Sequence, residues 1–514
     1  ARLTRAITDS RPIRELAGNP LLLTMMAILN RNQDLPRGRA DLYEQCSRLL
    51  LFQWEVEKTL RVDPDLAQDA GAIGLREKQD ILRQLARAMQ TGANGPLGNL
   101  IATDRLEAII EEAVRPLVRG APRAVARALI RHLRERNFIL CFAGGDSYAF
   151  VHRTFLEYFY ADDLRVRFEH EKSIDEENLK TQVFGPHRAD ETWHEMLCLV
   201  AGMIHPKALA SILEFLLAQP DPEQTCRHIF LAARCVGEVR KGSDLGSVEN
   251  KVKQRVNELV RFERHHSRQS RSEEVDVSSI RTQAVRLRAN IWQGDFETCN
   301  WLKACLQTEK DWDVRRAVVE ELAWGWKDDP HTLPLLKACT QIKEDLLMRM
   351  VAVVALAEGW KADPGVFLFL KIRAQSDEHW LVRMVTVRNL VYGWKDDPDT
   401  LPWLKARAQS DKNGEVRKVT LGELVRGWRD APDILPFLKV RAECDRKGAV
   451  RQAVVKALAR GWKDDPDTLP WLKARAQTDE HGDVRRAAVQ ALARGWKDDP
   501  ETVAWLKTLE QPDS

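Results

Sequence analysis

The side chains of this 514-residue sequence that could do chemistry are cysteine thiols, histidine imidazoles and paired carboxylates. Cys305 and Cys339 occupy the same slot in successive units of an internal repeat. Arginine fills this slot in four other units: Arg373, Arg407, Arg441 and Arg475. A reactive cysteine needs a specific electropositive environment. A slot that accepts either residue therefore indicates a tolerant, partly exposed position and argues against a nucleophile.

Histidines and acidic pairs are the other candidates. His265 and His266 are adjacent in a basic loop, where metal binding is the minor alternative to a plain surface loop. Acidic pairs such as Asp464 and Asp465 follow a lysine at most of the turns. We interpret these pairs as helix caps and solvated edges, with a ladder for divalent ions or a partner as the alternative.

Motifs that would define an active site are missing from the sequence. It contains no Gly-x-x-x-x-Gly-Lys-[Ser/Thr] loop, which would hold phosphate with its backbone amides. His-Glu-x-x-His, Gly-x-Ser-x-Gly and Gly-x-Gly-x-x-Gly are missing too. We therefore expect no catalytic residues and no metal site in this chain, and whether the protein is an enzyme stays open.

Composition excludes further classes of function. The 79 Lys and Arg residues against 76 Asp and Glu residues give a net charge of +3, so a polybasic coat for nucleic acid is excluded at the level of the whole chain. No window approaches the roughly 18 apolar residues of a membrane span. The first 16 residues lack the apolar core of a signal peptide. Nine cysteines without a C-x-x-C motif favour reduced thiols, and we expect a soluble cytoplasmic protein.

The elements that position these residues are dominated by a repeat. Gly-Trp pairs recur with a constant 34-residue period, and their glycines are Gly325, Gly359, Gly393, Gly427, Gly461 and Gly495. Trp292 precedes Trp326 by one such period, which indicates a degenerate earlier unit. Fourteen of the 16 tryptophans lie between Trp292 and Trp505, and we interpret them as packing residues, with an aromatic ligand cage as the alternative.

One unit, residues 464–496, shows the expected local structure. Asp467 is the predicted N-cap of a first helix. A second helix follows a polar bend and carries one apolar stripe, formed by Val484, Ala488, Val489 and Leu492. Gly495 is predicted to end this helix in the left-handed conformation. Each unit is too small to bury its apolar side alone, so stacked units are expected to form an α-solenoid.

Two repeat families use units of about this length. No unit contains the Leu-Gly-x-x-Tyr pattern of tetratricopeptide repeats. Most units instead open their second helix with Asp-x-x-x-x-Val-Arg, as in Asp479 to Arg485, and this pattern resembles HEAT repeats. The fold class we predict is mostly α: a winged-helix domain, then a helical domain, then a HEAT-like α-solenoid of 34-residue repeats over residues 286–514.

The winged helix is predicted from residues 123–151. A helical stretch over 123–136 precedes two β-rich runs, 138–142 and 148–151, on either side of a Gly144-Gly145 turn. A helix followed by a hairpin is the outline of a winged-helix domain. Residues 191–260 are expected to be helical, and 261–273 to form a polar loop or linker.

Two segments resemble NACHT-type STAND NTPases. The run ELAGNPLLLT at residues 15–24 is similar to the small helical domain that follows the nucleotide-binding core in this family. The run FVHRTFLEYF at residues 150–159 is similar to the end of the family's winged helix. The resemblance implies the end of a small helical domain over 1–35, a winged helix over 36–168 and a second helical domain with a linker over 169–285. Because the sequence starts at Ala1 in what resembles the middle of a domain, we expect it to be the C-terminal part of a longer protein.

The resemblance also implies roles for particular residues. Gly18 and Asn19 would shape a turn that places Pro20 against adenine, and His152 would contact the β-phosphate of ADP and hold a closed state. The alternatives are an ordinary helix-start proline and a capping or core histidine. ADP or ATP with Mg²⁺ is expected in the longer parent, which would be an ATPase, and no nucleotide is expected on this segment alone.

The function predicted from the sequence is the regulatory and ligand-sensing portion of a nucleotide-gated switch in bacterial signalling or defence against phage. A protein ligand would bind the solenoid, the partner domain would be the upstream nucleotide-binding domain, and activation would form a homo-oligomer. The candidate contact residues vary in type immediately before each repeat glycine: Trp324, Glu358, Tyr392, Arg426, Arg460 and Arg494. Drift at a neutral position explains this variation about as well.

Two alternatives stay open. A HEAT-repeat scaffold without switching would explain residues 286–514 but not the first 170. A nucleic-acid binder could use Arg131, Arg134 and Arg136 of the winged helix. However, residues 286–514 contain 38 Lys and Arg against 36 Asp and Glu, which gives no stripe of positive charge on average. Contact with nucleic acid or a membrane is therefore not expected.

Overall fold

A computed structural model describes residues 11–32, 34–36, 38–53, 73–92, 99–135, 137–222, 224–239, 245–263 and 276–510, together with Leu3 and Ile7. Arg136, His265 and His266 lie outside these residues. The chain forms two compact units, Ala1–Gln293 and Gly294–Ser514. Within the described ranges, no helix is both long and apolar enough to cross a membrane.

The first unit begins with short helices that precede and open the winged helix. In chain order these are α2 (Arg11–Ala17), α3 (Pro20–Asn32), α4 (Arg39–Arg48), the π-helical η1 (Leu49–Gln53) and α6 (Leu75–Gln90). The α6 helix is strongly amphipathic and buries Ile81, Leu82, Leu85 and Met89. It packs along α9 (Arg153–Glu169), whose aromatic residues fill the centre of this region.

The predicted winged helix is confirmed. Helices α7 (Thr103–Val114) and α8 (Pro122–Glu135) precede a hairpin of β2 (Leu140–Gly144) and β3 (Ser147–Phe150), and the short β1 (Ile101–Ala102) completes the antiparallel order β1-β3-β2. Gly144 and Gly145 have φ values of 87° and 58° in the turn, where a side chain would be strained. Phe150 at the end of β3 stacks on Phe159 of α9, and this contact joins the wing to the helical core.

A helical region completes the first unit. Its longer helices are α12 (Glu191–Met203), α13 (Pro206–Leu217), α14 (Arg227–Glu238), α15 (Ser247–Val260) and α16 (Val277–Ile291), preceded by α10 (Glu176–Asn178), the π-helical η3 (Leu179–Phe184) and α11 (Gly185–His187). Helix α12 packs on both α9 and α14, so it links the winged helix to the helices that follow.

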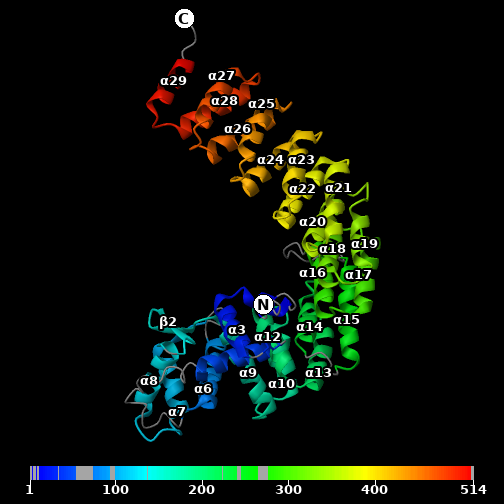
Figure 1. Cartoon of the computed structure of the whole chain (residues 1–514). Coiled ribbons are helices and arrows are strands. Elements are labelled where there is room, and N and C mark those ends of the chain that lie inside the picture. The colour runs from blue at the N-terminus through cyan, green and yellow to red at the C-terminus, as the bar shows by residue number, and fades with distance from the viewer. Residues whose placement is uncertain are drawn as a thin grey trace. The chain divides into compact units, whose positions relative to one another are not determined.

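The second unit is the predicted solenoid of helical pairs. The pairs are α17 (Phe296–Thr308) with α18 (Trp312–Gly325), α19 (Thr332–Cys339) with α20 (Leu346–Gly359), α21 (Pro364–Ser376) with α22 (Trp380–Trp394), α23 (Thr400–Ser410) with α24 (Gly414–Trp428), α25 (Ile434–Cys444) with α26 (Gly448–Gly461), and α27 (Thr468–Thr478) with α28 (Gly482–Gly495); α29 (Pro500–Glu510) follows. The second helices α18, α20, α22, α24, α26 and α28 each pack on the next, so they form one continuous layer. Within this unit they line its inner side (Figure 1).

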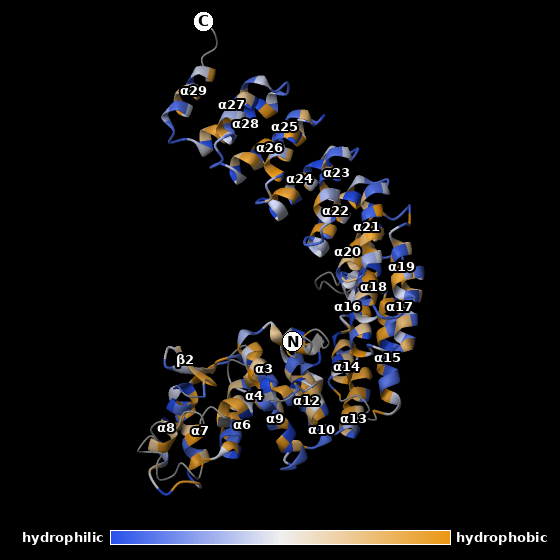
Figure 2. Cartoon of the chain, viewed as in Figure 1, coloured by the Kyte–Doolittle hydropathy of each residue, from blue (hydrophilic) through white to orange (hydrophobic). Residues whose placement is uncertain are grey.

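The core of the solenoid lies between its two layers, where apolar residues gather (Figure 2). The in-phase leucines of the first helices are fully buried: Leu302, Leu336, Leu370, Leu404, Leu438 and Leu472. So are the in-phase residues that open the second helices: Val314, Met348, Val382, Val416, Val450 and Val484. These two rows explain the 34-residue period, because each repeat must present the same apolar residues to both neighbours.

The ends of the repeat helices agree with the prediction in part. Asp467 is the N-cap residue of α27, as predicted, but its carboxylate makes no capping bond; Asp465 accepts instead from the backbone N–H of Asp467 and from the Thr468 hydroxyl. Gly495 does not adopt the left-handed conformation, since it is the last residue of α28 and Trp496 follows as the C-cap. The glycine of the pair instead permits close packing in one repeat, where a Cβ on Gly359 would lie 3.3 Å from the carbonyl oxygen of Ala323.

Candidate functional site

The two motifs at residues 15–24 and 150–159 meet in the first unit. Asn19 lies in the turn between α2 and α3, and His152 lies between β3 and α9. The Asn19 Nδ2 atom is 2.7 Å from the His152 Nε2 atom, although the residues are 133 positions apart. The structure thus brings together residues that the sequence assigned to one site.

Each partner in this contact is fixed by a helix start. The Asn19 Oδ1 atom accepts from the backbone N–H of Leu21 at 3.0 Å and caps α3, so its amide nitrogen must point toward His152. His152 is the N-cap residue of α9, and its Nδ1 atom is 3.0 Å from the Thr154 hydroxyl. The helix starts therefore orient the amide and the imidazole toward each other.

The direction of these hydrogen bonds assigns the imidazole tautomer. Because the Asn19 amide can only donate through Nδ2, His152 must accept through Nε2. Its proton then lies on Nδ1 and donates to the Thr154 hydroxyl. The Thr154 N–H lies 3.4 Å from the same Nδ1 atom, and only the other tautomer could accept this longer hydrogen bond. In this state His152 offers a lone pair and no N–H at Nε2.

The remaining residues of the predicted site lie at the same turn. Gly18 and Pro20 are both exposed, and Pro20 is the first residue of α3. A proline at this position fixes the start of the helix without losing a hydrogen bond, and its ring presents an apolar surface. The exposed proline ring thus directly follows Asn19, whose amide contacts the half-buried imidazole of His152.

A buried ion cluster near this site was not predicted. Arg39, the first residue of α4, donates from Nε to Glu238 of α14 at 2.8 Å and from Nη1 to Glu195 of α12 at 2.7 Å. The side chains of Arg39 and Glu238 are only 15% and 12% exposed. The cluster ties the winged helix to the helical region. No local sequence pattern reveals it, because its members are 156 and 199 residues apart.

Glu157, within the FVHRTFLEYF run, faces the same cluster. It accepts from Arg153 Nε at 2.9 Å, and Arg39 and Glu195 also contribute to its electrostatic environment. Burial raises the pKa of Glu157 to about 7, against the lowering effect of Arg153. The run therefore holds a carboxyl that takes up a proton near neutral pH.

We expect Glu157→Gln to change the pH dependence of stability. The raised pKa means that the native state holds a proton that the unfolded chain releases, so the unfolding free energy falls as pH rises from about 4.5 to about 7. Glutamine does not titrate, so the variant does not lose this part of the unfolding free energy. Urea denaturation of both proteins at pH 5 and pH 8 should show the variant gaining up to about 3 kcal/mol relative to wild type at the higher pH. Asp163, whose pKa is also raised by burial, contributes the same pH dependence in both proteins. If the difference in unfolding free energy between the two proteins is the same at pH 5 and pH 8, the raised pKa does not belong to Glu157.

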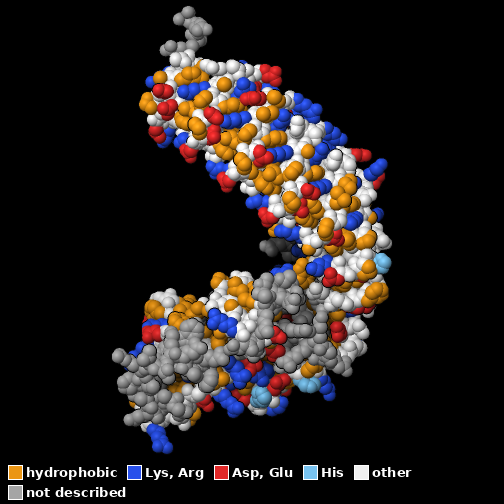
Figure 3. All heavy atoms as spheres, viewed as in Figure 1, with side chains coloured by type: hydrophobic (Ala, Val, Ile, Leu, Met, Phe, Trp, Pro, Cys, Tyr) orange, Lys and Arg blue, Asp and Glu red, His pale blue; other side chains and the backbone are white. Residues whose placement is uncertain are grey.

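The six predicted contact residues of the solenoid lie near the carboxyl ends of the second helices. Glu358, Tyr392, Arg426, Arg460 and Arg494 are exposed, and Trp324 is half-buried. The surface in Figure 3 shows Lys and Arg interspersed with Asp and Glu along this unit. The residues occupy one repeating position on the inner layer, where a ligand could contact several units at once.

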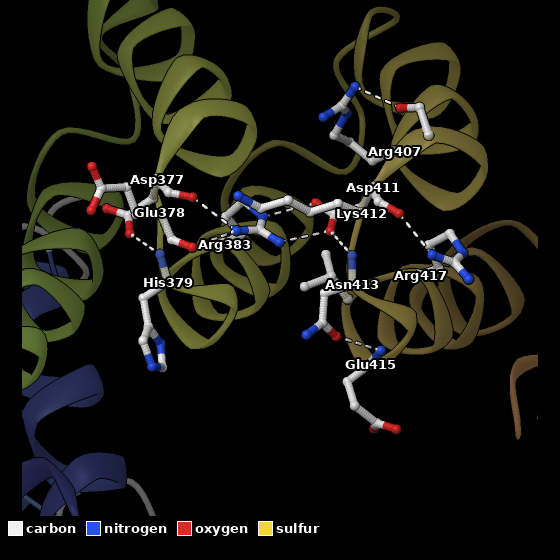
Figure 4. Close-up of polar contacts among 12 residues, drawn as sticks. Asp377, Glu378, His379, Arg383, Arg407, Asp411, Lys412, Asn413, Glu415 and Arg417 are labelled. Atoms are coloured by element: carbon white, nitrogen blue, oxygen red, sulfur yellow. Dashed lines mark hydrogen bonds and ion pairs between the residues drawn. The ribbon is translucent and has the colours of Figure 1, made fainter. Parts of the chain in front are cut away.

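Buried arginine–aspartate pairs connect successive repeats, and sequence reasoning missed them. An arginine of one repeat pairs with an aspartate of the next at a constant separation in sequence, in Arg349–Asp377, Arg383–Asp411, Arg417–Asp445 and Arg451–Asp479. The arginine also donates to a carbonyl in its own repeat, as Arg383 does to Asp377 at 2.8 Å (Figure 4). The signal was present in Asp-x-x-x-x-Val-Arg, but the pattern does not say that the two residues pair across the repeat boundary.

Among the described residues, no cluster of three or more His, Cys, Asp or Glu side chains could hold a metal ion. Of the two cysteines in the repeat slot, Cys305 is half-buried and Cys339 is buried. Burial raises the pKa of the Cys339 thiol, so this residue has the character of a core side chain.

Comparison with known proteins gives matches for both units. A family model described as a winged helix-turn-helix domain C-terminal to NACHT matches residues 39–164, and a model of HEAT repeats matches residues 275–357 and 411–493. A search of the curated proteins gives no match. One similar solved chain comes from work on molecular features of the UNC-45 chaperone critical for binding and folding muscle myosin. It is 12% identical, with a TM-score of 0.22, over 94% of this chain and 64% of that chain. This chain thus spans less than two thirds of that one.

Proposed function

We propose that this chain, which joins a winged helix of the kind found C-terminal to NACHT to an array of HEAT repeats, is the regulatory and ligand-sensing part of a nucleotide-gated STAND switch. In this proposal the upstream NACHT domain binds and hydrolyses ATP. The winged helix holds the inactive state, and the solenoid receives a protein ligand or stabilises the autoinhibited form. Release leads to homo-oligomerisation in the cytoplasm, in bacterial signalling or defence against phage.

The observation that carries the proposal is the contact between Asn19 and His152. Two short motifs far apart in the sequence converge on one polar contact, beside the exposed ring of Pro20. Neither motif needs the other for its local structure, since each already lies at the start of its own helix. Their convergence therefore supports a shared binding role.

The residues at this turn fit a nucleotide held mainly by another domain. Bound ADP would supply an adenine for the Pro20 ring and a negative charge for His152, which could donate through Nε2 after a change of tautomer or protonation. Asn19 competes for the same Nε2 atom, so His152 can serve the Asn19 amide or a phosphate but not both. Because this sequence has no phosphate-binding loop, the nucleotide and its Mg²⁺ belong to the NACHT domain of the longer protein.

The test is the rate of ADP release from the protein that carries the NACHT domain and this chain. We expect His152→Ala to weaken ADP retention by about 10- to 100-fold, because a hydrogen bond to a charged group contributes roughly 1.5–3 kcal/mol. Release of a fluorescent ADP analogue, measured by stopped flow, gives the rate directly.

His205→Ala is the matched control for this experiment. His205 is also an N-cap histidine, and it accepts from the backbone N–H of Lys207 at the start of α13. A capping role alone would make the two variants equally mild in their effect on ADP release. An unchanged release rate in His152→Ala would end the proposed role of this histidine.

A further inference from the structure

A hollow on the inner layer of the solenoid combines the predicted contact residues with others. It has a volume of about 460 Å³ and lies between α22 and α24. Its lining includes Arg388, Asn389, Tyr392, Lys395, Glu423 and Arg426. Two of these, Tyr392 and Arg426, occupy the variable slot before the repeat glycine, and they face one open space.

A buried carboxylate organises the cations of this hollow. The Glu423 side chain is 5% exposed, and its Oε2 atom forms an ion pair with Arg426 Nη1 at 3.1 Å. Its Oε1 atom lies 3.8 Å from Arg388 Nε. The side chain of Arg388 remains 54% exposed and that of Arg426 77% exposed. One acidic group thus holds two guanidinium groups in place while leaving most of their surface open to a ligand.

The positive charge exceeds what Glu423 neutralises. Exposed Lys395 lines the same hollow, and the Lys361 Nζ atom lies 5.8 Å from the centre of the Tyr392 ring. Three cations, Arg388, Lys395 and Arg426, therefore line the hollow with one carboxylate, and Lys361 lies over the Tyr392 ring. The nearly balanced charge of the whole array conceals this local excess.

Tyr392 adds an apolar contact at the edge of the cationic surface. Its side chain is 74% exposed, the joint highest value among the large hydrophobic residues of the described structure. Tyrosine and arginine are the residue types that dominate binding energy in protein interfaces, because they offer a large rigid surface and several donors. An exposed tyrosine between fixed arginines is suited to a peptide with both acidic and apolar side chains.

In the carboxyl halves of the second helices, the sign of the exposed charges changes along the solenoid. Exposed Glu320 and Glu358 precede the hollow, whereas exposed Lys456, Arg460 and Arg494 follow it. A uniform polyanion such as nucleic acid would meet the acidic end unfavourably. A protein segment with a local acidic cluster can contact the positive part alone.

We propose that the hollow between α22 and α24 binds an acidic segment of a protein ligand, whose carboxylates pair with Arg388 and Arg426 while an apolar side chain packs on Tyr392. This inference rests on the proposed ligand-sensing function and names the chemistry of the ligand. The hollow lies wholly within the second unit, so its test is independent of nucleotide.

The experiment measures binding of a fluorescent peptide that alternates Glu and Tyr to the full chain by anisotropy. A peptide of the same length with Gln in place of Glu, and a single-stranded DNA of equal charge, are the comparison probes. We expect the acidic peptide to bind best and its Kd to rise as salt is raised from about 0.05 M to about 0.5 M. Tyr392→Ala and Arg426→Gln should each weaken it by about tenfold.

Lys343→Gln is the control variant, because Lys343 is an exposed cation in the loop between α19 and α20, outside the hollow. It removes the same charge as Arg426→Gln and should leave the Kd unchanged. Equal loss in Arg426→Gln and Lys343→Gln, or no loss in Tyr392→Ala, would overturn the proposal. If the DNA binds more tightly than the acidic peptide, and Arg426→Gln abolishes that binding, the hollow is a nucleic-acid site and the proposal is wrong. If His152→Ala does not affect ADP release, the proposed nucleotide switch fails, but the peptide-binding result at the hollow still stands.

Discussion

Replacing Arg417 by Met is expected to lower the free energy of unfolding of the solenoid by about 3–5 kcal/mol. The Arg417 and Asp445 side chains are 1% and 2% exposed, and two N–H groups of Arg417 donate to the two carboxylate oxygens, each at 2.7 Å. A third donates to the carbonyl oxygen of Asp411. Burial opposes the charge of Asp445, but the hydrogen bonds from Arg417 and from the backbone N–H of Lys447, with the charges of Arg417 and Arg441, together lower the pKa of Asp445. Methionine fills much of the volume and leaves that carboxylate buried and unpaired.

Urea denaturation of the full chain, with hydrogen exchange to locate the loss, measures this effect. In a solenoid each repeat contacts only its neighbours, so the increased exchange should centre on α24 to α26. Arg486→Met is the matched control, since Arg486 makes an exposed pair with Asp483, with side chains 70% and 56% exposed, and should change stability by less than about 1 kcal/mol.

A double variant shows whether the loss comes from the unpaired carboxylate. Adding Asp445→Leu to Arg417→Met removes the buried charge that has lost its partner, so the double variant should recover much of the lost free energy of unfolding. If Arg417→Met costs no more than Arg486→Met, the buried pairs do not stabilise the repeat boundary as described.

Replacing Arg39 by Met is expected to destabilise the first unit by about 3 kcal/mol. Arg39 is the shared partner of Glu195 and Glu238, so its loss leaves two acidic groups together near α12 and α14. Burial already raises the pKa of Glu238, and Arg39 is the main group that offsets this effect. The contact between the winged helix and the helical region should weaken first.

Hydrogen exchange of α4, α12 and α14, together with urea denaturation, measures the loss. Arg48→Met is the control from the same helix, because Arg48 is 60% exposed and lies 3.8 Å from Glu44. Adding Glu238→Gln should rescue part of the stability by removing a buried charge. Equal behaviour of Arg39→Met and Arg48→Met would show that the cluster is not the tie between these regions.

The fold was predictable where one pattern repeats. The in-phase leucines and valines define which face of each helix is buried, and the Gly144-Gly145 turn between two β-rich runs defines the hairpin. The details that failed lie at the ends of helices, where residue type allows more than one arrangement. The Asp465 carboxylate accepts at the start of α27 where that of Asp467 does not, and Gly495 remains the last residue of α28.

The candidate site was predictable only in part. The resemblance of two motifs placed Asn19, Pro20 and His152 in one function, but nothing in the sequence indicated that the Asn19 amide contacts His152 directly. Tyr392 and Arg426 belong to the variable slot that the sequence indicated, whereas the hollow between them and the role of Glu423 were not predicted. Glu423 belongs to a different repeat from Arg388, and its role depends on how far one helix is turned relative to the next.

In the switch that we propose, the turn at Asn19 and the start of α9 respond together to the nucleotide state. The most direct measurement is hydrogen exchange of residues 16–23 and 150–156 in the proposed longer protein with a NACHT domain, loaded with ADP or with a non-hydrolysable ATP analogue. We expect both segments to exchange more slowly with ADP than with the ATP analogue. Identical exchange in the two states, or a change in only one segment, would contradict the account.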